Sequence, residues 1–81
     1  MKTMRIGSSI INLDATYGIN CDKRRDGTIV RVGHPNIIME YLVPDYFVPE
    51  VVAAAIQRGM NGKDDNFDLM AILTEFAEVS E

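Results

Sequence analysis

The stretch "INLDATYGINC", residues 11 to 21, decides the fold because its apolar side chains fall on alternate residues. Ile, Leu, Ala, Tyr, Ile and Cys occupy the odd positions, and polar residues or glycine occupy the even ones. A period of two over eleven residues predicts a β-strand with one buried face, which would place Tyr17 and Cys21 in the core. Because strands usually run about five or six residues, we expect a bend near Asp14 or Gly18.

Two more strands follow, each introduced by a turn signal. Asp26-Gly27 favours a hairpin because glycine accepts positive φ, and Pro35 breaks the chain again because it lacks a backbone donor. The strands between these signals are "TIVRV", residues 28 to 32, and "NIIMEYLV", residues 36 to 43. The latter is apolar on both faces, so we expect it to lie centrally or beneath a helix or partner. Together the three strands predict an antiparallel meander.

The second half of the chain has the pattern of two helices. Pro49 suits the first position of a helix that we expect to end at Gly59 in a left-handed cap. Alanines 53 to 55 leave little bulk on this helix, so another surface can approach its backbone closely. The second helix is expected to begin at "DDNFD", residues 64 to 68, with Asp65 as its cap.

A wide apolar stripe on the second helix, which begins with Phe67, exceeds what so small a core requires. We expect a second copy of the chain to cover part of it and form a homodimer. The residues assigned to this dimer interface are Met70, Leu73, Phe76 and Val79.

These elements predict one α+β domain over residues 1–81, with a β-meander in 1–43 and a helical half in 44–81. The meander has three or four antiparallel strands, and the two C-terminal helices are expected to pack on one face of it. The single Cys21 excludes an internal disulfide, and the N-terminal residues lack the apolar run of a signal peptide. We therefore expect a cytoplasmic protein without a membrane segment.

The charges are divided unevenly along the chain. Six cations against three acids give +3 for residues 1–36, whereas two against nine give −7 for residues 37–81. Three of the cations, Lys23, Arg24 and Arg25, lie at the predicted hairpin tip. They either solvate a turn or, with Arg5 and Arg31 on the same sheet half, contact an acidic partner. Nucleic acid is a weaker alternative, because Tyr17 is expected in the core and the net charge is −4.

A second candidate contact lies between two prolines, in "VPDYFVPE", residues 43 to 50. Tyr46 and Phe47 are held there by a stiff backbone. They either fill the space between strand and helix or present an aromatic anchor to a partner.

No set of residues indicates catalysis, a metal or a cofactor. His34 is the only histidine, so no zinc set can be assembled. The stretch from Asp64 to Glu75 resembles a calcium loop in spacing, but Leu69 stands where that loop requires glycine. The pair Gly62-Lys63 lacks the earlier glycine of a phosphate-binding loop. We therefore expect a protein that is not an enzyme and holds no cofactor or metal.

The sequence thus favours a small adaptor or inhibitor that acts by binding another protein. Neutralising a nuclease or a defence protein would suit its acidic half, which resembles nucleic acid in charge. The alternatives are a nucleic-acid-binding module that uses the basic tip, and an oligomer that binds a nucleotide or another small molecule. Arg25, Arg31 and Tyr46 would serve such a small-molecule site.

Overall fold

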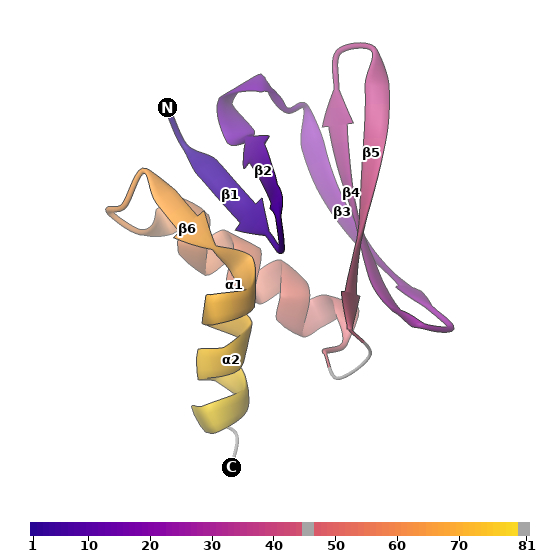
Figure 1. The fold of residues 1–81 in the computed structure, drawn as a ribbon, viewed down its shortest axis with the longest axis vertical. Helices are drawn as coiled ribbons and strands as arrows, with labels where there is room; N and C mark the ends of the chain where they lie inside the picture. The colour runs from indigo at the N-terminus through magenta and orange to yellow at the C-terminus, as the bar shows by residue number, and fades with distance from the viewer. Residues whose placement is uncertain (45–46, 80–81) are drawn as a thin grey trace.

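The computed structural model describes residues 1–44 and 47–79, which form two three-stranded sheets and two α-helices (Figure 1). The elements follow one another as β1 Thr3–Ile6, β2 Ser9–Asn12, the 3-10 turn η1 Leu13–Ala15, β3 Gly18–Arg24, β4 Gly27–His34, β5 Ile37–Pro44, α1 Pro49–Asn61, β6 Asn66–Asp68 and α2 Leu69–Val79. The fold class is α+β, as predicted.

The predicted meander is the sheet β3-β4-β5, which is antiparallel throughout. Both turn signals act as expected, since Arg24 pairs with Gly27 and His34 pairs with Ile37 across two-residue turns. Gly27 has a φ of 154°, and a Cβ there would overlap the carbonyl of Val43. Glycine is therefore required at this position by both backbone conformation and space.

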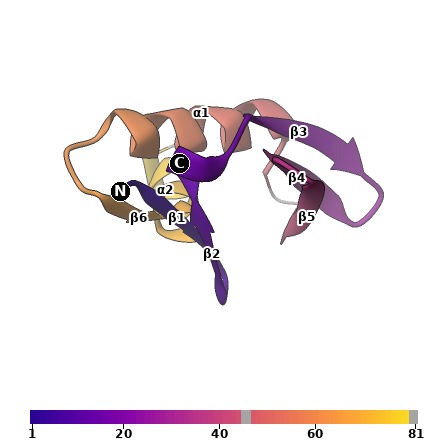
Figure 2. The ribbon, with the colours of Figure 1, turned by 90° about the horizontal axis from the view of Figure 1, so that it is seen from above.

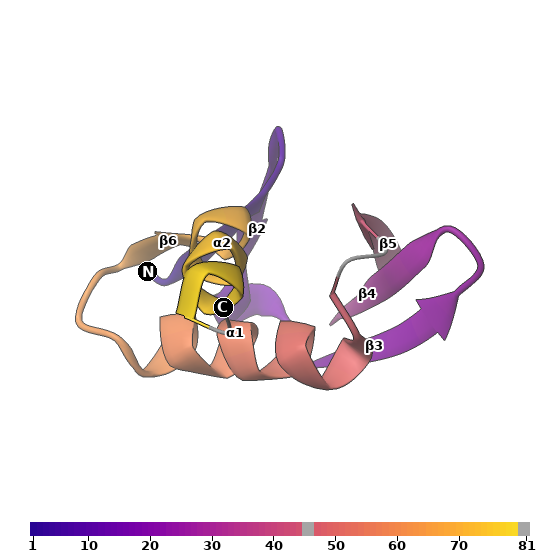
Figure 3. The same ribbon diagram turned by 90° about the horizontal axis from the view of Figure 1, so that it is seen from below.

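The second sheet was not predicted, and it joins the two halves of the chain. β1 pairs antiparallel with β2 and parallel with β6, which comes from the helical half. The backbone N–H of Thr3 donates to the carbonyl of Asp65 at 2.8 Å, and the Thr3 hydroxyl bonds to the side chain of Asn66. The two halves are thus parts of one interleaved structure. Figures 2 and 3 show α1 running along both sheets.

The alternating stretch at residues 11–21 is interrupted between two strands. Asn12 accepts a hydrogen bond from the N–H of Asp14 at 3.0 Å and begins the turn Leu13–Ala15. Ile11 and Leu13 are buried as predicted, but the turn rotates the chain and leaves Tyr17 80% exposed. The prediction of a core position for Tyr17 was therefore wrong, and the expected bend near Asp14 is this turn.

β5 is an edge strand rather than a central one. It pairs with β4 on one side, and no described strand pairs with its other side. Four of its apolar side chains are exposed: Ile37 by 58%, Ile38 by 66%, Met39 by 39% and Leu42 by 50%. The prediction of a central position was wrong, and neither helix covers these side chains.

Both helices differ from expectation at one end. α1 continues past Gly59 to Asn61, and Gly59 is needed because a Cβ there would overlap the ring of Phe67. α2 starts at Leu69, after the strand β6, and its cap is Asp68, whose carboxylate accepts from the N–H of Met70 at 3.0 Å. Asp65 was therefore wrongly predicted as the cap.

One core lies between the sheets and the helices. α1 packs on β3 and β4, and α2 packs on α1 and β1. The fully buried side chains come from all of these layers: Met4, Val30, Val32, Val43, Val52, Ala55, Leu69 and Leu73.

Candidate functional site

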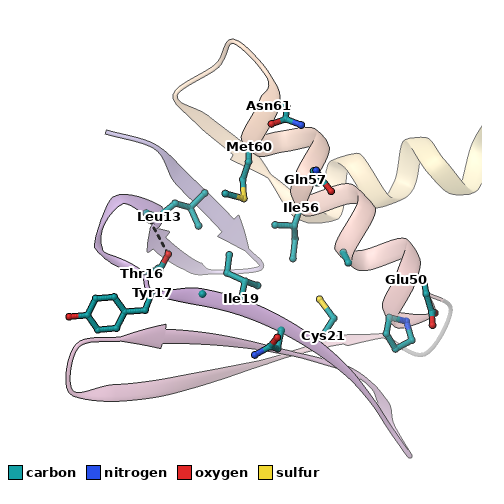
Figure 4. Close-up of a pocket in the computed structure, with 14 residues that line it drawn as sticks. Leu13, Thr16, Tyr17, Ile19, Cys21, Glu50, Ile56, Gln57, Met60 and Asn61 are labelled. Carbon is teal, nitrogen blue, oxygen red and sulfur yellow. Dashed lines mark hydrogen bonds between the residues drawn. The ribbon is translucent and has the colours of Figure 1, made fainter.

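A groove runs between α1 and β3, and we name it the α1–β3 groove (Figure 4). Its volume is about 760 Å³, within the range of ligand sites in proteins. One wall is α1, and the other is formed by the six consecutive residues from Thr16 to Cys21. The last four of these residues, Gly18 to Cys21, belong to β3. Because successive strand side chains point to opposite faces, four strand residues in a row line a groove where the strand edge itself faces it.

The edge of β3 along this groove is free. β3 pairs with β4 on one side, and no described strand lies on the other. Arg24 and Gly27 close a two-residue turn, and the pair that closes such a turn exchanges backbone hydrogen bonds. By alternation, the backbone groups of Ile19, Cys21 and Lys23 point away from β4 and into the free edge. These groups can bond to an added strand.

The floor of the groove is apolar and its rim is polar. Ile19 and Cys21 point from β3 toward α1, where Ile56 and Met60 face them (Figure 4). Ala53, the first of the three alanines, lines the groove and is exposed. Its small side chain lets a bound segment approach the backbone of α1 closely. The polar lining residues are Thr16, Asn20, Glu50, Gln57 and Asn61.

Cys21 is half-buried in this groove. Burial raises the pKa of its thiol because the thiolate is poorly solvated there. The side chain therefore behaves as a small apolar group at neutral pH rather than as a nucleophile.

The predicted basic tip is formed by one end of β3 and its turn, and its cations are not equivalent. Lys23 and Arg25 are exposed, and neither forms an ion pair with any described residue. Arg24 instead contacts Glu40 with 3.2 Å between Nη2 and Oε2. Free positive charge at the tip thus comes from Lys23 and Arg25, just beyond the α1–β3 groove.

Arg31 lies in the middle of the sheet and holds a row of charges together. Its Nε lies 2.8 Å from Oε2 of Glu40 on β5, and its Nη1 pairs with Asp22 on β3. With Arg24 these residues form a four-membered cluster whose formal charges cancel. Arg5, in β1, belongs to the other sheet. Arg31 therefore ties three strands together and is not part of the tip.

The aromatic candidate falls partly outside the structure. Tyr46 lies outside the described residues. Phe47 is half-buried against the core, and its carbonyl accepts a hydrogen bond from the hydroxyl of Thr28 at 2.7 Å. This arrangement favours the interpretation that Phe47 fills the space between sheet and helix.

The residues assigned to a dimer interface on α2 differ in accessibility. Leu73 is fully buried within the chain, and Met70 and Phe76 are half-buried against the core. The guanidinium of Arg58 lies 5.4 Å from the centre of the Phe76 ring. The side chain of Val79 lies outside the described residues. Much of the stripe is thus covered within one chain.

Over the described residues, no His, Cys, Asp and Glu side chains gather in a group that could hold a metal ion. Neither α1 nor α2 is long and apolar enough to span a bilayer, judged over those same residues. Comparison with models of protein families, with curated proteins and with solved structures finds no match to this chain. The function must therefore be argued from its geometry.

Proposed function

We propose that this chain is a protein-binding module that recognises an extended segment of a partner protein in the α1–β3 groove. The segment adds a strand to the free edge of β3 and lies beside α1. The observation that supports this most directly is the lining of the groove by six consecutive residues, Thr16 to Cys21. A strand edge beside a helix offers backbone hydrogen bonds for affinity and pockets between the two elements for specificity.

The chemistry of the groove suggests the chemistry of the segment. Ile19, Ile56 and Met60 favour an apolar side chain at every second position that faces the floor. Lys23 and Arg25 favour acidic residues where the segment leaves the groove. Glu50 lines the groove at the end nearer the basic tip. Because Glu50 would repel acidic residues inside the groove, we place the acidic residues of the segment outside the groove, beside Lys23 and Arg25.

A displayed library of random peptides, each about twelve residues long, tests this proposal, because that length exceeds the span of β3. We expect selected peptides to alternate apolar residues and to carry acids near one end. Ala53→Tyr fills the groove and should abolish their binding. Ala54→Tyr is the matched control, because Ala54 is equally an exposed alanine of α1 but does not line the groove. Peptides that bind both variants as well as the wild type would place recognition elsewhere.

An inhibitor or adaptor role follows from this mode of binding. A module that covers an extended segment blocks whatever that segment does, or joins it to a second protein. Neutralisation of a nuclease or defence protein remains one form of this proposal.

The nucleic-acid alternative has less support. Of the five cations proposed for it, Arg24 and Arg31 are paired with acids, and Arg5 lies in the other sheet. Tyr17 is exposed and could stack on a base, but it precedes β3, about 20 Å along the strand from the tip. Binding of mixed oligonucleotides that weakens steeply with salt would favour this alternative over protein binding.

The small-molecule alternative depends on Arg25, Arg31 and Tyr46. Arg31 is already paired with Asp22 and Glu40, and Tyr46 lies outside the described residues. Native mass spectrometry of protein purified from its host would reveal a retained ligand if this alternative holds.

A further inference from the structure

We propose that two copies of this chain pair through β5, antiparallel and about a two-fold axis at Glu40, to form one continuous six-stranded sheet. This inference is independent of the proposed function, because it uses the opposite edge of the meander from the α1–β3 groove.

The first argument is that β5, from Ile37 to Val43, lacks the usual protection of an edge strand. Natural edges carry charges, prolines or bulges that prevent pairing with another chain. β5 runs for eight residues, Ile37–Pro44, and exposes apolar side chains on both faces. Its only charged residue, Glu40, is neutralised within the chain by Arg24 and Arg31. An edge with these features is suited to pairing.

The second argument concerns the backbone groups that the edge presents. His34 and Ile37 close a two-residue turn, so by alternation Ile38, Glu40 and Leu42 direct their N–H and C=O groups away from β4. By the same alternation, the backbone of Pro44 faces away from β4. Proline lacks an N–H, but at this position it removes no hydrogen bond between β4 and β5, as expected for proline at an edge. Three residues are thus ready to bond, and Pro44 limits the pairing at one end.

The third argument selects the occupant, because β5 is complementary to itself in one register. With the axis at Glu40, Ile38 faces Leu42 of the second copy on the outer face of the sheet. On the inner face, Met39 faces Tyr41 and Ile37 faces Val43. Moving the axis to Met39 or Tyr41 would instead set the carboxylate of Glu40 opposite Ile38 or Leu42. Cross-strand apolar pairs stabilise a sheet, so the register at Glu40 is preferred.

The charges at the axis agree with this register. The two Glu40 side chains face each other, and like charges in that position would ordinarily repel. Each carboxylate is held by Arg31, with 2.8 Å between Nε and Oε2, and by Arg24 at 3.2 Å. The cluster of Asp22, Arg24, Arg31 and Glu40 is neutral in each copy. The two clusters therefore meet without a net charge.

A cleft runs along part of the β5 edge. A cleft of about 460 Å³ separates the turn between β1 and β2 from β5, and its lining includes the consecutive residues Glu40, Tyr41 and Leu42. Consecutive residues line it because the strand edge faces it, as in the α1–β3 groove.

The first experiment measures mass by sedimentation or light scattering over a concentration series up to about 100 µM. We expect the wild type to approach twice the 9.1 kDa mass of one chain. Ile38→Lys and Leu42→Glu should each raise the dimer dissociation constant at least about tenfold, because each sets a charge opposite an apolar residue. Ile10→Lys is the matched control, since Ile10 is also 66% exposed but lies on β2.

The register is tested by rescue. The double variant Ile38→Lys/Leu42→Glu, or a mixture of the two single variants, should dimerise again because lysine then faces glutamate. In a Cys21→Ser background, Glu40→Cys should form an intermolecular disulfide on mild oxidation, whereas Ile38→Cys should not. The Cα atoms at the axis would be about 5.5 Å apart, and those of the two residues 38 about 14 Å.

Three results would overturn the proposal. They are a wild type that remains monomeric throughout the series, a double variant that is not rescued, and a dimer that survives Ile38→Lys but is lost in Ala77→Arg. The last result would place the interface on α2, where Ala77 is exposed. Circular dichroism of each variant checks that the chain remains folded, which is expected because Ile38 and Leu42 are exposed.

Discussion

The backbone of Gly59 lies against the ring of Phe67, so closely that a Cβ at position 59 would overlap three ring carbons. Gly59 lies in α1, and Phe67 lies in β6, which pairs with β1. This one contact therefore sets the distance between the helix and the second sheet. Glycine costs about 1 kcal/mol in a helix interior, and close packing explains why it is present.

We predict that Gly59→Ala destabilises the fold by about 1–3 kcal/mol despite the higher helix propensity of alanine, because the ring must move. Gly62→Ala is the control, since Gly62 has an ordinary φ of −72° and a Cβ there would lie 3.4 Å from its nearest neighbour. Urea unfolding measures both variants. A Gly59→Ala protein as stable as the wild type would contradict the close packing.

The cap of α2 yields a second prediction. Removing the carboxylate by Asp68→Ala should cost about 1 kcal/mol, because the N–H of Met70 loses its acceptor. Asp68→Asn should retain most of the stability, since its amide oxygen also caps. Asp65→Ala should change the free energy of unfolding by less than about 0.5 kcal/mol, because the described contact of Asp65 uses its backbone carbonyl. Equal losses for Asp65→Ala and Asp68→Ala in urea unfolding would argue against this assignment.

Local signals were sufficient to predict the meander and both helices. Gly27 and Pro35 mark turns through their own backbone chemistry, and Pro49 starts α1 for the same reason. Such signals act within a few residues of the chain and do not depend on the rest of the fold.

The second sheet depends on contacts distant in sequence, so local signals could not predict it. β6 has three residues, and it is a strand because Thr3 to Arg5 of β1 pair with it. Phe67 was consequently assigned to the apolar stripe of a helix. The alternation at residues 11–21 predicted one continuous strand, but a 3-10 turn interrupts it at Leu13–Ala15. A 3-10 turn can keep Ile11 and Leu13 buried while it redirects the residues that follow.

The binding surfaces were predicted least well, because a free edge is a property of the whole sheet. The apolar pattern of β5 indicates that it avoids water but does not indicate what covers it. The α1–β3 groove had one local signal, the alanines at 53 to 55. Its other wall, Thr16 to Cys21, was assigned to a buried strand.

A third prediction concerns Cys21 and pH. Burial raises the pKa of its thiol, so the thiolate forms at higher pH in the folded protein than in the unfolded chain. Alkylation by iodoacetamide at pH 8 should therefore be slower in the folded state. By linkage, the folded state is stabilised relative to the unfolded state below the ordinary thiol pKa, and this stability is lost as pH rises through the raised value.

Cys21→Ser is the control for this pH dependence, because it should remove the loss of stability on the alkaline side. A peptide bound in the α1–β3 groove should slow alkylation further, since Cys21 lines the groove. Alkylation of the folded protein at the rate of the unfolded chain would show that the thiol is not shielded.

The fourth prediction separates the two roles of the cations at the tip. Lys23 and Arg25 have no ion pair with a described residue, so the variant Lys23→Ser/Arg25→Ser should change stability by less than about 0.5 kcal/mol. Its association with peptides selected for the α1–β3 groove should be slower, and the difference should shrink as salt screens the charges. Stopped-flow or surface binding kinetics over a salt series measures this effect.

The matched control is Arg5→Ser/Lys63→Ser, which removes the same charge from two other exposed cations without a described ion pair. Arg5 lies on β1 and Lys63 follows α1, so neither is at the tip. If net charge alone governs association, both double variants should slow it equally. If the tip guides the acidic end of a segment into place, only Lys23→Ser/Arg25→Ser should do so. Equal rates for both variants and the wild type would leave "CDKRRDGT", residues 21 to 28, as a solvated hairpin turn.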